Sequence, residues 1–391
     1  MRSFSLFSPT LVVIAITNLV TAQDILTFGT GSANIPFSVV LAPNAGFPTT
    51  LHAIVSFSTP SRQMPIDVVP AHSVAKVSSS LTANQYCRAW YSPAFSGLLF
   101  TAHPSAGGIR MWDASLPKLS PGSLAVVGAG AATNYSHEGL ETYSGVLGTW
   151  LYYGEHWAPS GLGGLRVFKV GSSTTLSPAG TAFPPGGSDG NALEVDRDGR
   201  YVWQMGWTGN LATNGVLYTY DTNNKTQLVP SVSLSNTKAL TGTAAYTVAN
   251  YDRYLEKNLL TENTLVSTNG VDGLQCFDIT NKAVPTFGSV FGYHYYKLNG
   301  NGLVLNIRGV TFIPGTDIGM LFGHIDISGV PSDFVWFITA GSPAGSFAPI
   351  PGGLIIIPGF QISDAKILGS KVYMVGKNRA TNSGEYRRYP N

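Results

Sequence analysis

The residues best suited to chemistry are histidines and carboxylates that recur in polar loops along the chain. They are His137, Glu138, His156, Asp189, His294 and His324. Neutral imidazole and carboxylate groups are the usual ligands of first-row metal ions, and imidazole carries protons near neutral pH. The four histidines are therefore candidate ligands of a divalent metal ion. His137, Glu138, His156, Asp189 and His294 are the candidates for acid/base catalysis.

A structural role is the alternative for each of these residues. None of them stands at a recognised ligand spacing such as His-Glu-x-x-His, so the metal site rests only on the alignment of repeated loops. Such side chains also close the ends of strands without binding anything. For any single histidine the pattern favours this structural role.

Another group of residues is suited to binding. It consists of His103, Trp157, Trp207, Asn269 and His324, which occupy equivalent loops of a repeated unit. Exposed indole rings stack against sugar rings or anchor a protein partner. We expect these five residues to contribute to a recognition surface if their loops lie on one face of the molecule.

Composition argues against other partners and cofactors. The net charge is +2 and no basic cluster extends beyond Arg387-Arg388, so a nucleic-acid partner is not expected. Cys87 and Cys276 have no metal-ligand spacing, and whether they pair stays open. Cys276 is expected to be structural, because a reactive thiol needs a partly exposed electropositive setting.

The elements that must position these residues form a repeated β-hairpin. Copies start at residues 36, 98, 150, 201, 264, 319 and 371, a spacing of 51 to 63 residues. The second strand of each copy alternates apolar and polar residues, as in Leu165-Arg166-Val167-Phe168, which is typical of a half-buried strand. Gly (45 residues) and Pro (24 residues) are spread along the chain, as many turns require.

Two more strands follow each hairpin, so one repeat holds four strands in roughly 50 to 60 residues, the size of a propeller blade. The sequence predicts an all-β fold, a single seven-bladed β-propeller of four-stranded antiparallel blades with few helices. A β-helix is the alternative, but its repeats are far shorter. The chain ends after the second hairpin strand of its last repeat, so Ile25–Phe28 is expected to supply the missing outer strand and close the ring.

One copy of the repeat resembles a known family. Gly273-Leu274-Gln275-Cys276-Phe277-Asp278-Ile279-Thr280-Asn281, followed by Pro285 and Gly288-Ser289-Val290, is similar to the repeat of LVIVD-type, YVTN-like propellers. The segment Gly108–Ser115 resembles it more loosely. The resemblance implies the propeller fold and a surface or secreted location, and it implies no particular chemistry.

The N-terminus reads as an export signal. Arg2 precedes an apolar stretch from Leu11 to Val20, and Val20-Thr21-Ala22 suits a signal peptidase. We expect a signal peptide at 1–22 and a propeller domain at 23–391, secreted to the extracellular space, or to the periplasm or cell surface in a bacterium. No membrane span is expected, because that stretch is too short to cross a bilayer. Sequons at Asn134 and Asn224 are expected to carry glycans in a eukaryotic host.

Two functions from different classes remain open on the sequence. The first is a non-catalytic, monomeric binding protein whose partner is an extracellular protein or a glycan. The second is a propeller enzyme, hydrolase- or lactonase-like or a metal-dependent oxidase, with a His/carboxylate site near the axis of the ring. That second function predicts that at least three of the candidate catalytic and metal residues share one cavity.

Overall fold

The computed structural model describes the following residues: 24–43, 51–58, 61–67, 77–78, 89–92, 98–103, 108–113, 125–126, 140–145, 148–155, 164–170, 176–182, 188–208, 215–222, 233–239, 254–268, 274–291, 304–327 and 329–390. In several strands only the backbone path is described.

The described strands form seven four-stranded antiparallel sheets, which we number as blades in chain order. Blade 1 contains β2 (Pro36–Pro43), β3 (Leu51–Ser58), β4 (Ser61–Asp67) and β5 (Val77–Ser78). Blade 2 contains β6 (Ala89–Ser92), β7 (Leu98–His103), β8 (Gly108–Asp113) and β9 (Ala125–Val126). Blade 3 contains β10 (Leu140–Gly145), β11 (Gly148–Glu155), β12 (Gly164–Val170) and β13 (Leu176–Ala182).

The remaining blades follow the same order. Blade 4 contains β14 (Ser188–Val195), β15 (Tyr201–Thr208), β16 (Gly215–Asp221) and β17 (Ser233–Ala239). Blade 5 contains β18 (Tyr254–Lys257), β19 (Thr264–Thr268), β20 (Leu274–Asp278) and β21 (Thr286–Phe291). Blade 6 contains β22 (Val304–Phe312), β23 (Ile318–Ile327), β24 (Val330–Ala340) and β25 (Phe347–Pro358). Blade 7 contains β26 (Phe360–Leu368), β27 (Lys371–Asn378), β28 (Ser383–Pro390) and β1 (Asp24–Thr30).

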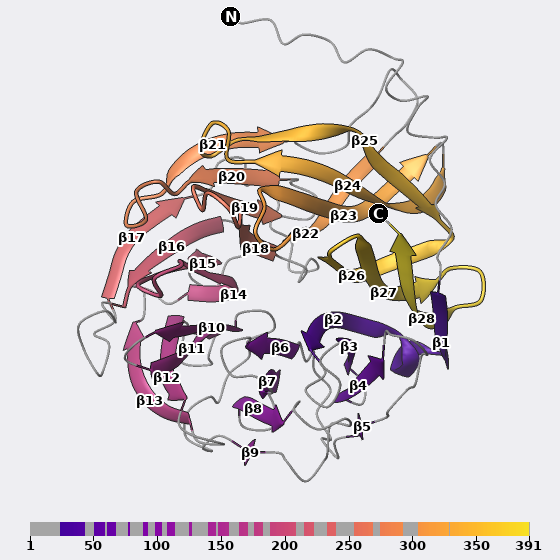
Figure 1. Cartoon of the computed structure of the whole chain (residues 1–391), viewed down its shortest axis with the longest axis horizontal. Helices are drawn as coiled ribbons and strands as arrows, with labels where there is room; N and C mark the ends of the chain where they lie inside the picture. The colour runs from indigo at the N-terminus through magenta and orange to yellow at the C-terminus, as the bar shows by residue number, and fades with distance from the viewer. Residues whose placement is uncertain are drawn as a thin grey trace, which may run out of the picture.

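The blades form a closed ring (Figure 1), with the first strand of each blade contacting the first strands of its two neighbours. Blade 7 is completed from the other end of the chain, because β1 pairs antiparallel with β28 and sets Leu26 opposite Tyr386. Asp24 also forms an ion pair with Arg388 across this junction. The seven-bladed fold and the closing strand at Ile25–Phe28 are thus confirmed. Among the described residues the only helix is a 3-10 turn, η1 (Ser32–Asn34).

The predicted start of the first repeat, residue 36, lies one strand too early. From blade 2 onward each copy starts at or within two residues of the second strand of its blade, as β7 and β15 show. In blade 1, however, residue 36 begins the innermost strand β2, and the second strand is β3. The hairpin β2–β3 resembles the others because both of its strands are apolar, whereas β4 (Ser-Arg-Gln-Met-Pro-Ile-Asp) carries little strand signal.

The core lies in the seams between blades. Trp150, Leu151, Tyr152 and Tyr153 on β11 are all almost fully buried, as a strand covered on both faces requires. One apolar cluster spans blades 3 and 4, another blades 4 and 5, and a third joins blades 5, 6 and 7. The cluster between blades 1 and 7 includes Leu26 and Phe28 of the closing strand.

Polar bonds fasten neighbouring blades to one another. The Tyr152 hydroxyl of blade 3 donates to the Gly199 carbonyl of blade 4 over 2.7 Å. Asp364 of blade 7 accepts the backbone N–H of Val39 in blade 1 at 3.0 Å. Because buried polar groups are costly without partners, such bonds fix how each blade sits against the next.

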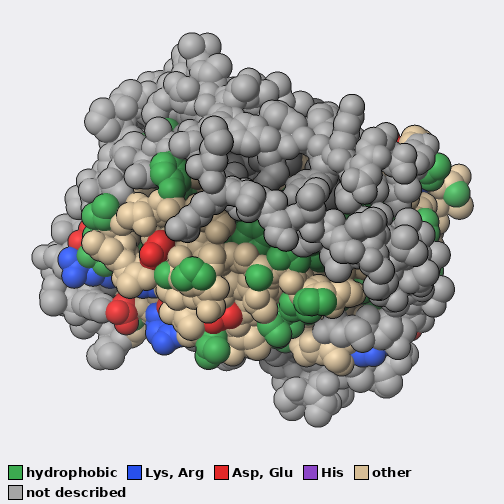
Figure 2. All heavy atoms as spheres, turned by 90° about the horizontal axis from the view of Figure 1, so that it is seen from above, with side chains coloured by type: hydrophobic (Ala, Val, Ile, Leu, Met, Phe, Trp, Pro, Cys, Tyr) green, Lys and Arg blue, Asp and Glu red, His purple; other side chains and the backbone are tan. Residues whose placement is uncertain are grey.

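The outer surface is mixed in character. Figure 2, seen from above relative to Figure 1, shows hydrophobic side chains mostly as separate groups, with charged side chains of both signs gathered toward the left. The described residues include no helix long and apolar enough to cross a membrane.

Candidate functional site

A cleft of about 390 Å³ opens where blades 4 and 5 meet. It lies on the rim formed by the turns that join first to second and third to fourth strands. Its lining residues are Asp196, Arg197, Asp198, Arg200, Tyr201, Thr261, Glu262, Asn263, Thr280 and Lys282. We call it the blade 4/5 cleft. Six of these ten residues are charged, in a chain with only 11% charged residues.

The blade 4 wall is the turn between β14 and β15. Asp196 exchanges backbone hydrogen bonds with Tyr201 and Gly199, and its carboxylate accepts the Tyr201 N–H at 3.0 Å. Gly199 has φ +68, and a Cβ there would lie 2.2 Å from the Tyr143 ring of blade 3. Glycine therefore suits this position twice over, through its backbone freedom and through the close approach of the ring.

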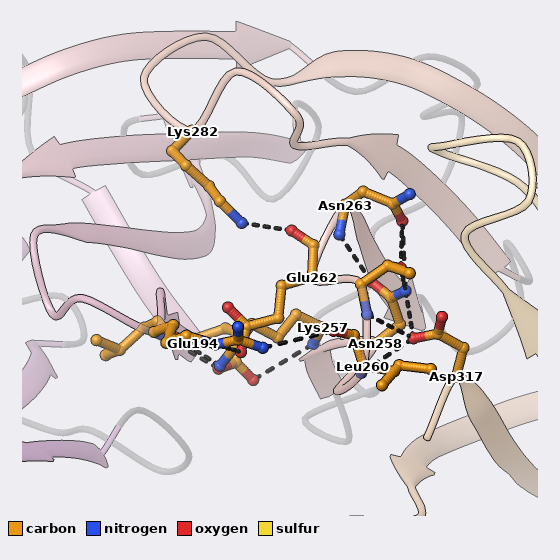
Figure 3. A network of polar contacts seen from close by, with 11 residues as sticks. Glu194, Lys257, Asn258, Leu260, Glu262, Asn263, Lys282 and Asp317 are labelled. Carbon is orange, nitrogen blue, oxygen red and sulfur yellow. Dashed lines mark hydrogen bonds and ion pairs between the residues drawn. The ribbon is translucent and has the colours of Figure 1, made fainter. Parts of the chain in front are cut away.

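The blade 5 wall is the turn from Asn258 to Asn263, which blade 6 holds in place (Figure 3). The Asp317 carboxylate accepts the N–H groups of Leu260 and Thr261, each at 3.1 Å. Asn258 accepts the Asn263 N–H at 3.1 Å. Bonds from two elements thus fix the turn before any ligand arrives.

Glu262 adopts a strained backbone conformation within this turn. Its φ is +47, in the left-handed region that non-glycine residues seldom occupy. In this position its carbonyl accepts a hydrogen bond from the Lys282 ammonium, and its carboxylate lies 3.4 Å from Arg197 (Figure 3 shows the Lys282 contact). Strain of this kind persists where surroundings hold it, often at functional sites.

Each cation of the blade 4/5 cleft has an anionic or carbonyl partner. Arg200 binds both carboxylate oxygens of Asp221, at 2.9 and 2.7 Å. Lys282 bonds the Glu262 carbonyl and lies 5.6 Å above the Trp203 ring. Burial lowers the pKa of Lys282, as expected for an ammonium group with reduced access to water.

Asp196 is the buried carboxylate of the cleft, with 6% of the residue exposed. Its pKa is raised, first by burial and to a lesser degree by the charge of Asp198. The hydrogen bond from the Tyr201 N–H opposes that rise but does not cancel it.

A buried ion pair joins the same two blades at the level of their innermost strands. The Lys257 ammonium lies 2.6 Å from the Glu194 carboxylate and donates to the Val195 carbonyl at 2.6 Å. Burial alone would lower the pKa of Lys257, but the charge and hydrogen bond of Glu194 raise it. This pair lies beside the turn that carries Glu262, whose charge also contributes.

Further charges lie near the axis of the ring. Lys366 of blade 7 is 3.5 Å from Glu256 of blade 5, and the Tyr254 hydroxyl donates to Asp364 at 2.8 Å. Blade 6 stands between blades 5 and 7, so these side chains meet on the axial side of β22. Burial raises the pKa of Glu256 to about 7, with Glu194 adding to the rise and Lys366 opposing it.

Glu141 of blade 3 belongs to the same group. Its pKa is raised well above the ordinary value by burial and by the charges of Glu194 and Glu256. A carboxyl group near the axis with a raised pKa is the kind of group expected in acid/base chemistry.

His324 is the predicted site residue whose side chain is described. It lies within strand β23, opposite Asn306 and Asp333, and not in a loop as the repeat alignment predicts. Its Nδ1 lies 3.2 Å from an Asp333 carboxylate oxygen and 3.2 Å from Arg379. Asp333 is fully buried, accepts a hydrogen bond from Arg379 at 2.6 Å and accepts the Ile362 N–H of blade 7 at 2.7 Å. The cluster therefore clamps blade 6 to blade 7. A metal-binding or recognition role for His324 stays a prediction.

Three other predicted residues lie on described strands, with only their backbones described. His103 ends β7 opposite Gly108, and Asp189 on β14 stands opposite Trp207 on β15. The remaining candidates lie outside the described residues: His137, Glu138, His156, Trp157, Asn269, His294 and the sequons at Asn134 and Asn224. Within the described part of the chain, no three His, Cys, Asp or Glu side chains are grouped to hold a metal ion.

Cys276 is a buried free thiol on β20. Burial raises its pKa to about 12, so it is protonated at neutral pH and inert as a nucleophile. Cys87 lies outside the described residues.

The segment 186–190 reads Gly-Gly-Ser-Asp-Gly and so matches the Gly-x-Ser-x-Gly pattern of a nucleophile elbow. That motif requires a sharp turn from a strand into a helix. Ser188 instead begins β14 and pairs with Thr208 on the antiparallel strand β15. The pattern therefore forms no elbow.

The sequence predicts a site on the opposite rim, because most of the recurring histidines and tryptophans fall there, and it does not predict the blade 4/5 cleft. A signal for the cleft does exist in the segment Asp196-Arg197-Asp198-Gly199-Arg200, which places four charges between two apolar strands. The axial charges have a weaker signal, a single Glu256-Lys257 pair in a short strand. The sequence of neither segment reveals which residues of another blade it contacts, so neither site could be predicted from the sequence.

Comparisons with known proteins support the fold alone. No family model matches the sequence, and no curated protein matches it. A solved structure, the β-propeller domain of Cps50 (Swd1) from Myceliophteria thermophila, aligns over 93% of this chain and 99% of its own with a TM-score of 0.56 and 9% sequence identity. The resemblance to LVIVD-type repeats is therefore supported as far as the β-propeller fold and no further.

Proposed function

We propose that this protein is a secreted, non-catalytic binding protein whose ligand, an extracellular protein or glycan, occupies the blade 4/5 cleft. Propellers are commonly binding scaffolds, and the loops at the ends of their blades carry the ligand contacts. The single observation that carries the proposal is the strained backbone of Glu262, a residue that lines the cleft. Its left-handed backbone is held in place by Lys282, Arg197 and the bonds from blade 6, at the wall of an open cleft.

The pairing of charges inside the cleft supports recognition. Arg197 has 65% of its side chain exposed, yet it is held against Glu262 and the Leu260 carbonyl. Side chains that are oriented before binding lose little conformational entropy when a ligand arrives. Arg and Tyr are also enriched among the residues that dominate binding energy.

Arrays of extracellular proteins and of glycans, probed with the purified secreted protein, test this function. A ligand found there should bind Arg197→Ala at least about tenfold more weakly than the native protein, because one charged contact is worth about that factor. Lys377→Ala removes a cation from β27 at the opposite rim and serves as the matched control, with no change expected. Loss of binding on Trp207→Ala or Trp157→Ala, with Arg197→Ala unchanged, would place the ligand on the opposite rim instead.

Glu256 favours a second candidate function, acid/base catalysis of the hydrolase- or lactonase-like class near the axis. A carboxyl group with a pKa of about 7 holds and releases protons efficiently at neutral pH. Assays with a panel of ester and lactone substrates should then show turnover that Glu256→Gln abolishes. Turnover that survives this substitution would remove Glu256 from the reaction.

A further inference from the structure

Blade 5 presents apolar side chains beside the blade 4/5 cleft. Among the described residues five large hydrophobic side chains are exposed, and three of them, Leu260, Val284 and Phe287, belong to blade 5 and its turns. Leu260 precedes the cleft residue Thr261 in the turn between β18 and β19, and Val284 shares the turn between β20 and β21 with the cleft residue Lys282. We call Leu260 and Val284 the blade 5 shoulder. Single exposed apolar residues are common on protein surfaces, whereas their concentration at one place marks a contact surface.

The backbone of Leu260 is fixed although the residue is 59% exposed. Its N–H donates to the Asp317 carboxylate of blade 6 at 3.1 Å (Figure 3), and its carbonyl accepts a hydrogen bond from Arg197 of blade 4 at 3.4 Å. Two neighbouring blades therefore hold this turn with an apolar side chain left in water. Covering that side chain with a partner is favourable, because it removes apolar surface from water.

The two turns of the shoulder are also tied to each other. The Lys282 ammonium in one turn donates to the Glu262 carbonyl in the other. Within its own turn, Val284 donates its N–H to the Asn281 carbonyl at 3.1 Å. The shoulder is thus held in place at the wall of the cleft, so covering it costs little conformational entropy.

The charges of the cleft balance and favour no sign of charge in a partner. Its lining holds three cations and three carboxylates, which are Arg197, Arg200, Lys282, Asp196, Asp198 and Glu262. Arg197 is paired with Glu262, and Arg200 is paired with Asp221. A charged group of a ligand would have to compete with these pairs, whereas an apolar contact on the shoulder leaves them intact.

We propose, resting on the binding function above, that the ligand of the blade 4/5 cleft is another protein, which packs apolar side chains against the blade 5 shoulder and needs no net charge at the contact. An apolar centre bordered by arginine and other polar groups is the usual composition of a protein–protein contact. The cleft and the shoulder together provide both parts.

The aromatic rings near the cleft argue against a glycan. Sugar rings bind by stacking against an open aromatic face. The Tyr201 ring lines the cleft, but the Arg200 guanidinium lies 5.1 Å above it. The Trp203 ring is fully buried, with the Lys282 ammonium 5.6 Å from it. Leu260 and Val284 offer a sugar no such face, whereas apolar side chains of a protein can pack against them.

Random linear peptides displayed on phage and selected on the whole protein probe this surface. Peptides enriched on the native protein are synthesised with a fluorescent label and titrated by fluorescence anisotropy. The enriched sequences should share aliphatic or aromatic residues and no common sign of net charge. Their affinity should change less than about threefold between low and high salt, since salt screens charges and leaves apolar contacts in place.

Matched serine variants locate the contact. Leu260→Ser should weaken peptide binding at least about tenfold and Val284→Ser at least about threefold, because each removes apolar area that the partner covers. Serine keeps the backbone bonds of both turns, and circular dichroism checks that the variants fold. Val330→Ser is the matched control and should leave the affinity unchanged, because Val330 is 61% exposed at the turn between β23 and β24 on the opposite rim.

Several results would overturn the proposal. A selection that yields no peptide sensitive to Leu260→Ser would exclude the shoulder as a contact, as would an equal loss of binding on Val330→Ser. A dimer of this chain that Leu260→Ser dissociates would assign the shoulder to a second copy. An array glycan whose binding is weakened by Arg197→Ala and not by Leu260→Ser would overturn the partner class and leave the binding function standing.

Discussion

Replacing Lys257 by Met tests how blades 4 and 5 are held together. The Lys257 ammonium makes two charge-assisted hydrogen bonds of 2.6 Å, one to Glu194 and one to the Val195 carbonyl. The side chains of Lys257 and Glu194 are only 11% and 10% exposed. Met has a similar length and keeps the apolar contacts of the lysine stem, so the substitution removes mainly the charge.

The expected loss of unfolding free energy is about 3–5 kcal/mol, the usual result of leaving one member of a buried ion pair without its partner. The structure agrees with this range. Two hydrogen bonds to or from a charged group contribute about 1.5–3 kcal/mol each, and packing of the Met side chain restores part of that sum. The Glu194 carboxylate retains its bonds from the N–H groups of Val195 and Lys257.

Urea unfolding at pH 7.5, followed by circular dichroism and tryptophan fluorescence, measures the effect. The matched comparison is the double variant Lys257→Met/Glu194→Leu, which removes both charges. It should be more stable than Lys257→Met alone by about 2 kcal/mol or more, because no unpaired charge stays buried.

Two results would refute this reasoning. The first is a loss below about 1 kcal/mol for Lys257→Met, the value typical of an exposed ion pair. The second is strict additivity of the two single substitutions, which would show that the two groups do not interact in the folded protein.

Three further predictions concern other parts of the ring. Glu256 has a folded-state pKa of about 7 against an ordinary value of 4.5, so the folded protein keeps a proton that the unfolded chain releases. The free energy of unfolding should therefore fall as pH rises from about 4.5 to about 7. A pH series of urea unfolding midpoints should show a shallower fall in the variant Glu256→Gln. Asp333→Asn should lower the free energy of unfolding, measured by heat or urea, by about 2–4 kcal/mol, because Asp333 makes the bonds to blade 7. His324→Ala should lower it by about 1 kcal/mol or less, and equal losses for the two variants would contradict this role of Asp333. Gly384→Ala would set a Cβ 1.7 Å from the Asn34 carbonyl oxygen, so the pairing of β1 that closes the ring should weaken. The unfolding midpoint should fall and the protein should aggregate on size-exclusion chromatography. An unfolding midpoint equal to that of the native protein would contradict the close approach.

Much of the fold follows from local patterns in the chain. Alternating strands at intervals of 51 to 63 residues can pair with their neighbours through short turns, so each blade is specified by its own segment. A last repeat that lacks its outer strand requires a partner from elsewhere, and an apolar strand near residue 25 supplies one. The one error in the repeat, at residue 36, arose because β2–β3 is as apolar as the hairpins that follow it.

The sites depend on contacts between distant segments, and local patterns do not encode these. Asp317 lies 56 residues beyond Thr261, yet it sets the turn that carries Glu262. Glu194 meets Lys257 over a separation of 63 residues, and Tyr254 meets Asp364 over 110.

His324 shows the same division between sequence and tertiary structure. The repeat alignment places it in a loop, whereas the structure places it within strand β23, and its partner Arg379 comes from the next blade, 55 residues away. The sequence by itself therefore determined the repeat, the number of blades and the closure of the ring. Only the tertiary structure decided which charges face one another. The curvature of the ring, rather than any local pattern, brings charged side chains of different blades within bonding distance.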